Sequence, residues 1–217
     1  MIKELDELMK KRDTEGILEL LDSNPEVLNE LNENGSTGFA IIAYSGMPEV
    51  FAKAISLKET FTYHEAILAG KIEIVKGYLD ADLPNRLNEY SNDGFAPIAL
   101  AAFFNQIEIA ELLAELGADP NLAATNPTKV NALHAAVAKE NTHLCKLLIA
   151  KGANVNASQM ADVTPLHSAV HRGNVELTRL LLDFGAQPDL KMQNGDTAMI
   201  IAEREGHQPI LDILRNY

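Results

Sequence analysis

The 217-residue sequence predicts an all-α solenoid of about seven helix–turn–helix units with short hairpin loops. The first observation is a repeated segment of the type Thr-Pro-Leu-His-x-Ala-Val. One apolar position in this segment recurs at residues 98, 133, 166 and 199, in steps of 35, 33 and 33. The second observation is a segment of the type Gly-Ala-x-x-Asn/Asp at 117–121, 152–156 and 185–189, in the same phase. A period near 33 residues indicates stacked copies of one supersecondary unit.

The unit that begins at Thr164 shows how each helix is specified. Thr164 is a good N-cap, and a proline suits the first helical position that follows it. Leu166, Ala169 and Val170 have i, i+3, i+4 spacing and form one apolar stripe. Gly173 ends this first helix because glycine tolerates the left-handed conformation. Residues 175–181 then supply the apolar face of a second helix, which ends at 185, and stacking of such units buries both faces.

The N-terminal third of the chain carries a weaker version of the pattern. Phe39 and Tyr63 occupy the recurring apolar position, and Leu5 begins an earlier unit. Units are therefore expected to start near residues 5, 39, 63, 98, 133, 166 and 199. The step from 39 to 63 is only 24 residues, so the loop after the second helix of the second unit is expected to be missing, near residues 56–62.

These segments resemble the ankyrin repeat family, whose unit reads roughly D-x-x-G-x-T-P-L-H-x-A-A-x-x-G and is followed by a second helix and G-A-D-x-N. The resemblance is strongest over 154–189, clear over 92–217 and divergent over 1–91, and it predicts one domain spanning 1–217. It implies a curved stack in which first helices line a concave face and hairpin fingers project from it. A tetratricopeptide-like stack has a similar period, but that family lacks the Gly-Ala-Asp-x-Asn hairpin.

Four positions depart from the family pattern. Lys129 and Asp162 stand where the finger glycine is expected, and Asn105 and Glu140 replace the glycine that ends the first helix. Asparagine adopts the left-handed conformation readily. Glutamate does not, so the turn at Glu140 is expected to be made by Asn141 instead.

The net charge of −13 argues against nucleic acid as a partner. It is spread along the chain, with −8 over residues 1–85 and −5 over 86–217, and no basic cluster is larger than 10–12. Nucleic-acid binders need basic patches that neutralise phosphates. An acidic surface favours a protein partner with a basic patch, although solubility alone also accounts for the charge.

The sequence contains no candidate for membrane insertion or secretion. No apolar run approaches the roughly 20 residues needed to span a membrane, and residues 1–13 lack the apolar core of a secretory signal. The single cysteine, Cys145, excludes an intrachain disulfide framework. A cytoplasmic location is therefore expected.

No residue pattern indicates an enzyme, a cofactor or a metal. Phosphate-binding and nucleophile-elbow motifs are absent from the sequence. The resemblance implies that His64, His134 and His167 occupy a framework position, where the ring bonds to adjoining loops. His167 and His171 have i, i+4 spacing, but no acidic or Cys ligand completes a metal site. Cys145 lies in a second helix, where a packing role is expected.

The resemblance predicts a protein–protein interaction module, such as an adaptor, inhibitor or effector, that binds through its concave face and fingertips. A self-associating scaffold is the alternative, although a monomer is expected. Aromatic and Arg side chains dominate binding energy, so they mark the candidate positions at first-helix ends and fingertips. An apolar centre is expected around the fourth unit, unless Phe103 fills the space beside Ala101 and Ala102. The candidate protein-binding residues are Tyr44, Phe95, Phe103, Phe104, Lys139, Met160, His171, Arg172 and Arg204.

Overall fold

The computed structural model describes all 217 residues as fourteen α-helices and two short 3-10 helices. It confirms the predicted all-α helical solenoid. The chain divides into two compact units, Met1–Gly77 and Tyr78–Tyr217, which are described separately. Helix α6 (Ile72–Arg86) crosses the division and is broken at Asp82, whose φ is −158° and ψ 62°.

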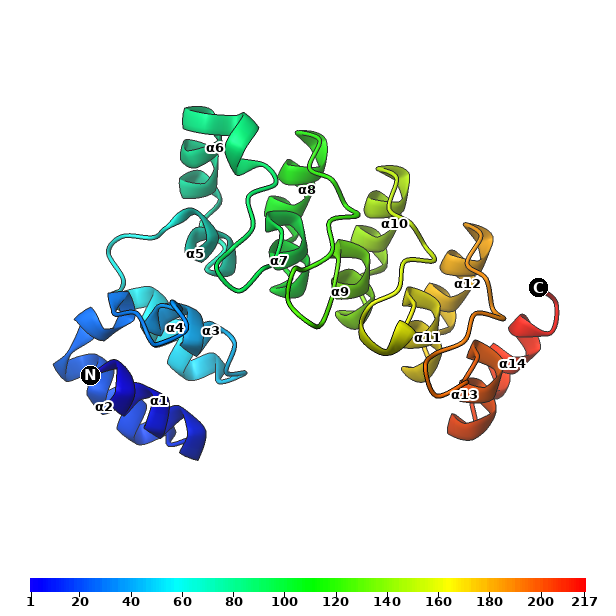
Figure 1. The fold of residues 1–217 in the computed structure, drawn as a ribbon, viewed down its shortest axis with the longest axis horizontal. Helices are drawn as coiled ribbons and strands as arrows, with labels where there is room; N and C mark the ends of the chain where they lie inside the picture. Colours follow the sequence, from blue (N-terminus) through cyan, green and yellow to red (C-terminus); the bar gives the residue numbers. More distant parts are fainter. The chain divides into compact units, whose positions relative to one another are not determined.

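In the Met1–Gly77 unit, short helices follow one another in antiparallel pairs (Figure 1). Its elements are α1 (Ile2–Lys11), α2 (Thr14–Ser23), η1 (Pro25–Asn29), α3 (Gly38–Ala43), α4 (Pro48–Leu57), α5 (Tyr63–Leu68) and the start of α6. Side-chain caps from Asp13, Thr37 and Thr62 fix the first turns of α2, α3 and α5. The core that these helices enclose contains Leu5, Ile17, Leu21, Phe39, Ile42 and Ile67, all fully buried.

The predicted loss of a finger after the second helix pair is confirmed. Only residues 58–62 connect α4 to α5, and they form no hairpin. Lys58 in this connection is buried, and its Nζ lies 2.5 Å from Asn29 Oδ1 and 3.3 Å from Glu65 Oε1. The same ammonium lies over the rings of Phe39 and Phe61, at 5.4 and 6.0 Å from the centroids. A buried cation therefore joins the segments that a hairpin would otherwise connect.

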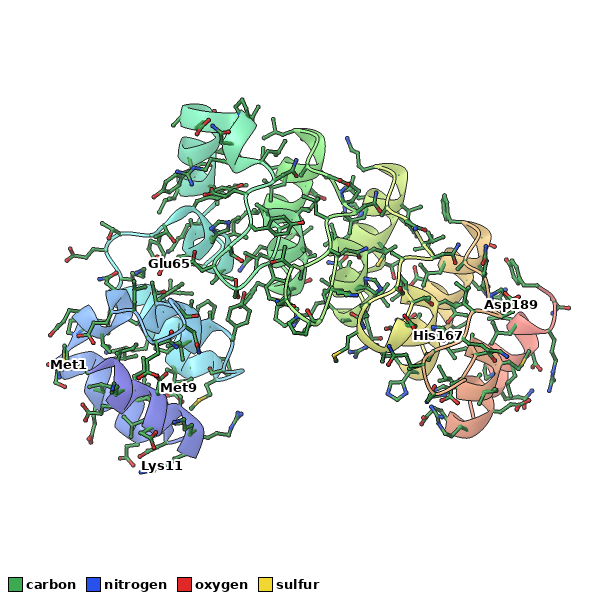
Figure 2. The ribbon with its side chains drawn as sticks, in the orientation of Figure 1. Met1, Met9, Lys11, Glu65, His167 and Asp189 are labelled. Carbon is green, nitrogen blue, oxygen red and sulfur yellow. The ribbon has the colours of Figure 1, made fainter.

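Glu65 corrects the predicted register of the third helix pair. Thr62, not Tyr63, starts the helix as its N-cap, so His64 fills the recurring apolar position and Glu65 fills the framework histidine position. The Glu65 carboxylate accepts hydrogen bonds from the Thr62 backbone N–H, at 3.0 Å, and from Thr37 Oγ1, at 2.7 Å (labelled in Figure 2). The predictions of Tyr63 in the apolar position and His64 in the framework were therefore wrong by one residue, because a carboxylate performs the bonding assigned to an imidazole.

In the Tyr78–Tyr217 unit, the first helices α7, α9, α11 and α13 pack side by side in series. The second helices α8, α10, α12 and α14 form an outer row against them (Figure 1). The bounds are α7 (Pro97–Phe103), α8 (Ile107–Glu115), α9 (Ala132–Ala138), α10 (Thr142–Ala150), η2 (Met160–Asp162), α11 (Pro165–His171), α12 (Val175–Asp183), α13 (Ala198–Glu205) and α14 (Gln208–Leu214).

Hydrogen bonds between successive fingers hold the Tyr78–Tyr217 unit in register. The Thr125 N–H donates to Gly94 O, and the Met160 N–H donates to Thr128 O, each at 2.9 Å. Nearer the helices, the Asn121 side chain donates to Gly152 O and accepts from the Asn154 N–H, at 2.9 and 2.8 Å. The Asn156 side chain repeats this arrangement one finger later, with Gly185 and Gln187. Each finger thus satisfies backbone groups of the next one.

The four departures from the family pattern keep the glycine-like backbone. Lys129, Asp162 and Asn105 have φ of 52°, 56° and 56°, in the left-handed region that glycine favours. Glu140 also has a left-handed φ, of 55°. The expectation that Asn141 would make this turn was therefore wrong. Asn141 is instead the N-cap of α10, with its side chain accepting from the Leu144 N–H.

Candidate protein-binding surface

The ends of the first helices in the Tyr78–Tyr217 unit form one exposed line, which we call the ridge. Positions two to five after each N-cap are mostly buried against neighbouring helices, whereas positions seven and eight reach the surface. The pattern follows from helix periodicity, since the stack covers one face of each first helix and leaves its last turn open. The ridge consists of Phe103, Phe104, Ala138, Lys139, Glu140, His171, Arg172, Arg204 and Glu205.

Phe103, Phe104 and Lys139 form the apolar end of the ridge. Phe103 retains 38% of its surface exposed, whereas Ala101 and Ala102 are fully buried, so Phe103 lies outside the core. Its ring meets the Phe104 ring edge-on, with the centroids 5.3 Å apart. The exposed Lys139 Nζ lies 4.8 Å from the Phe103 centroid, within the range of a cation–π interaction. The structure therefore brings three of the predicted residues together.

His171, Arg172 and Arg204 form the charged end of the ridge. Arg172 lies 3.9 Å from Glu140 of the preceding helix pair, and His171 Nδ1 lies 3.6 Å from Glu205 of the following pair. Arg204 donates to Asp196 at 2.5 Å, an interaction that lowers the pKa of that aspartate. The long, exposed pairs of Arg172 and His171 contribute little to stability, so these two side chains remain available to a partner, whereas Arg204 is held by Asp196.

The two fingertip candidates differ in exposure. Met160 begins η2 and is 59% exposed. Phe95 follows Gly94 in the first finger of this unit and is half-buried, and its backbone bonds to Ser91 on both sides. Tyr44 belongs to the other unit, where it ends α3 and is 38% exposed. Met160 is thus the fingertip side chain with the larger apolar surface.

Several exposed apolar residues were missed in the sequence, among them Ile200 and Phe184. Ile200 is 43% exposed and stands at the framework position of α13, three residues after the N-cap Thr197. Phe184 is 55% exposed at the end of α12. The repeat phase signals Ile200, since it aligns with His134 and His167. The same phase aligns Phe184 with Lys151, because both are the C-cap residue directly before a glycine.

The framework histidines of this unit are buried and hydrogen-bonded. His167 Nδ1 bonds to the Thr164 N–H at 3.1 Å, and its Nε2 lies 3.0 Å from Leu190 O in the next finger (Figure 2). His134 Nδ1 lies 2.8 Å from Asn131 Oδ1, and burial lowers the His134 pKa to about 4. The predicted bond from the ring to an adjoining loop is therefore confirmed for His167, whereas the ring of His134 bonds to the N-cap of its own helix.

Cys145 is fully buried, and desolvation raises the pKa of its thiol to about 12. A thiol with so high a pKa is a poor nucleophile near neutral pH. The structure contains no group of three or more His, Cys, Asp or Glu side chains placed to share a metal ion. None of its helices combines the length and apolar character required to cross a bilayer.

The family model described as "Ankyrin repeats (3 copies)" matches twice, over residues 63–159 and 133–217. The two matches overlap and together cover the helix pairs from α5 to α14. A search of curated proteins found no match. Because the matched residues exceed half of the chain and coincide with its helix pairs and fingers, this protein belongs to the ankyrin repeat family.

Proposed function

We propose that this protein is an adaptor, inhibitor or effector that binds a partner protein through the ridge and the neighbouring fingertips. Ankyrin repeats are generally protein–protein interaction modules and typically non-catalytic. The observation that carries the choice of surface is Phe103, an aromatic side chain that is 38% exposed and stacked beneath the Lys139 ammonium. Aromatic side chains beside cations are the residue types that dominate binding energy at interfaces.

The partner that this proposal favours is basic overall. The formal charge of −13 creates a potential that attracts basic proteins and raises their association rate. A cytoplasmic location is part of the proposal. It is supported by the single cysteine, which is buried and free.

The proposal is tested with Phe103→Ala/Phe104→Ala, which removes the apolar end of the ridge. Wild type and variant are used as baits in proximity labelling in the native cell, and the captured proteins are then titrated in purified form. We expect at least a tenfold loss of affinity for the genuine partner, since a buried aromatic anchor contributes about 2 kcal/mol or more. The melting temperature should change little, because Phe103 lies outside the core.

The matched control is Phe184→Ala, which removes an exposed aromatic from the end of α12, away from the ridge positions. It should leave partner affinity unchanged. A ridge variant that binds normally but unfolds at a much lower temperature would assign Phe103 and Phe104 to packing and overturn the proposal.

A further inference from the structure

We infer that the ridge binds an extended segment of its partner in which an apolar residue is followed by acidic residues three and six positions later. This inference rests on the proposed function and specifies the chemistry of the segment in contact. It follows from the exposed Phe103 ring at the end of α7, the cations at the ends of α9 and α11, and the spacing of these helices.

The apolar part of the proposed contact surface consists of Phe103 and Ala138. These two residues stand at equivalent positions of α7 and α9, seven residues after each N-cap, and His171 takes this position on α11. Ala138 is half-buried and carries only a methyl group at this position. An apolar partner side chain placed there would cover the exposed part of the Phe103 ring, which is the main apolar surface of the ridge.

The ridge is locally cationic although the unit around it is acidic. Tyr78–Tyr217 contains 17 acidic and 10 basic residues. The ridge contains three basic residues and only two acidic ones, with His171 in addition. Arg204 is neutralised by Asp196 and Glu205. Positive charge is therefore concentrated toward α9 and α11.

Lys139 is the cation best placed to meet a partner's carboxylate. It is exposed, and no carboxylate of this chain lies within 4 Å of its ammonium, which instead rests on the Phe103 ring. Arg172 comes next on α11. It is 41% exposed and only 3.9 Å from one carboxylate, Glu140. A carboxylate from a partner would gain charge complementarity at both positions without displacing a short ion pair.

The spacing of the segment follows from the packing of the first helices. Helices in contact lie about 8–10 Å apart and an extended chain advances about 3.3 Å per residue, so roughly three residues separate side chains over successive helices. A segment crossing α7, α9 and α11 would thus place its apolar residue beside Phe103. Its two carboxylates would lie beside Lys139 and Arg172. A basic segment would face the same cations and be repelled, so the positive charge of a partner that is basic overall would lie outside this segment.

The test is an NMR titration of the full-length, ¹⁵N-labelled protein with three synthetic peptides. Their common core is Leu-Ser-Ser-X-Ser-Ser-X, where X is Glu, Gln or Lys, at peptide concentrations up to several millimolar. We expect saturable shifts of the Phe103, Ala138, Lys139 and Arg172 amides with the Glu peptide. Binding should be several-fold weaker with Gln and undetectable with Lys. Lys139→Glu should reverse this order, whereas Lys146→Glu on the outer helix α10 should preserve it.

The inference is overturned if the Lys peptide binds as tightly as the Glu peptide, if the shifts map away from the ridge, or if no peptide saturates. Its failure is distinguishable from that of the proposed function. If proteins captured in cells depend on Phe103 and Phe104 but the Glu peptide does not bind, the ridge is a binding surface for a partner of different chemistry. If the captured proteins bind wild type and Phe103→Ala/Phe104→Ala with the same affinity, the proposed function itself fails.

Discussion

At the scale of single residues, burial determines which histidines act as framework and which remain at the surface. His134 and His167 are buried and bond at their N-caps, whereas His143 is exposed and bonds to Glu111 on the outer row. Burial disfavours the charged imidazole, so it lowers the pKa of both framework histidines. The effect is larger at His134, whose Nε2 is buried without a hydrogen bond of normal length.

This difference predicts a pH dependence of stability. The His134 pKa falls from 6.5 to about 4 on folding. Above pH 6.5 the imidazole is neutral in both the folded and the unfolded state, so the folded state keeps its full stability. As the pH falls toward 4 the unfolded state binds the proton first, and the free energy of unfolding decreases by at most about 3 kcal/mol. Urea unfolding of wild type and His134→Gln from pH 7.5 to 4 should show the variant losing less stability on acidification. His143→Gln is the control and should follow the wild type; equal slopes for all three proteins would refute the assignment.

At the scale of elements, the buried Lys58 replaces a finger. The connection 58–62 is too short for a hairpin, so the backbone bonds that join fingers elsewhere are unavailable between α4 and α5. Lys58 instead bonds to Asn29 and Glu65, and Glu65 bonds to Thr37. A charge this deeply buried is tolerated only because it is paired and hydrogen-bonded.

Removal of one member of this pair should therefore be costly. Lys58→Met leaves the Glu65 carboxylate buried without its cation, and we expect a loss of about 3 kcal/mol in the free energy of unfolding. The double variant Lys58→Met/Glu65→Gln should lose less than the two single variants combined, because neither charge remains. Lys53→Met is the control, since its ion pair with Asp22 is more exposed and should contribute less than about 1 kcal/mol. Similar losses for Lys58→Met and Lys53→Met would contradict the account.

At the scale of the whole molecule, charge and surface composition favour a monomer. The Met1–Gly77 unit has 14 acidic and 8 basic residues, so both units of the chain are acidic. Like charge opposes association of identical copies. Helices α1 and α13 each carry several exposed charged side chains, which add to this acidic, solvated surface.

Light scattering across protein concentration should therefore report the mass of one chain, 23.7 kDa, at low and at physiological salt. Added salt screens the repulsion, so any weak association should strengthen as the ionic strength rises. A mass that increases with concentration at low salt would favour the self-associating scaffold. Repeating the measurement with Phe103→Ala/Phe104→Ala would then show whether the ridge forms that contact.

Much of the Tyr78–Tyr217 unit could be predicted because its framework residues repeat. Thr164, Pro165 and Gly173 each act locally, through a cap, a fixed φ or a left-handed turn, so they identify their element without knowledge of its neighbours. The register at Tyr63 could not be predicted in the same way. There the framework histidine is replaced by Glu65, whose partners Thr37 and Lys58 become neighbours only after folding.

The candidate site also divides into features that local sequence specifies and features that depend on folding. The helix period places Phe103, Lys139, His171 and Arg172 at the ends of first helices, and this much is readable from the sequence. Whether the Phe103 ring is covered depends on the side chain that the neighbouring helix α9 places against it. That side chain belongs to Lys139, 36 positions later in the chain. The sequence by itself determined the repeat, its caps and its turns, because these are interactions between near neighbours. Only the tertiary structure decided the buried Lys58 and the exposure of Phe103, because each depends on groups that stacking brings together.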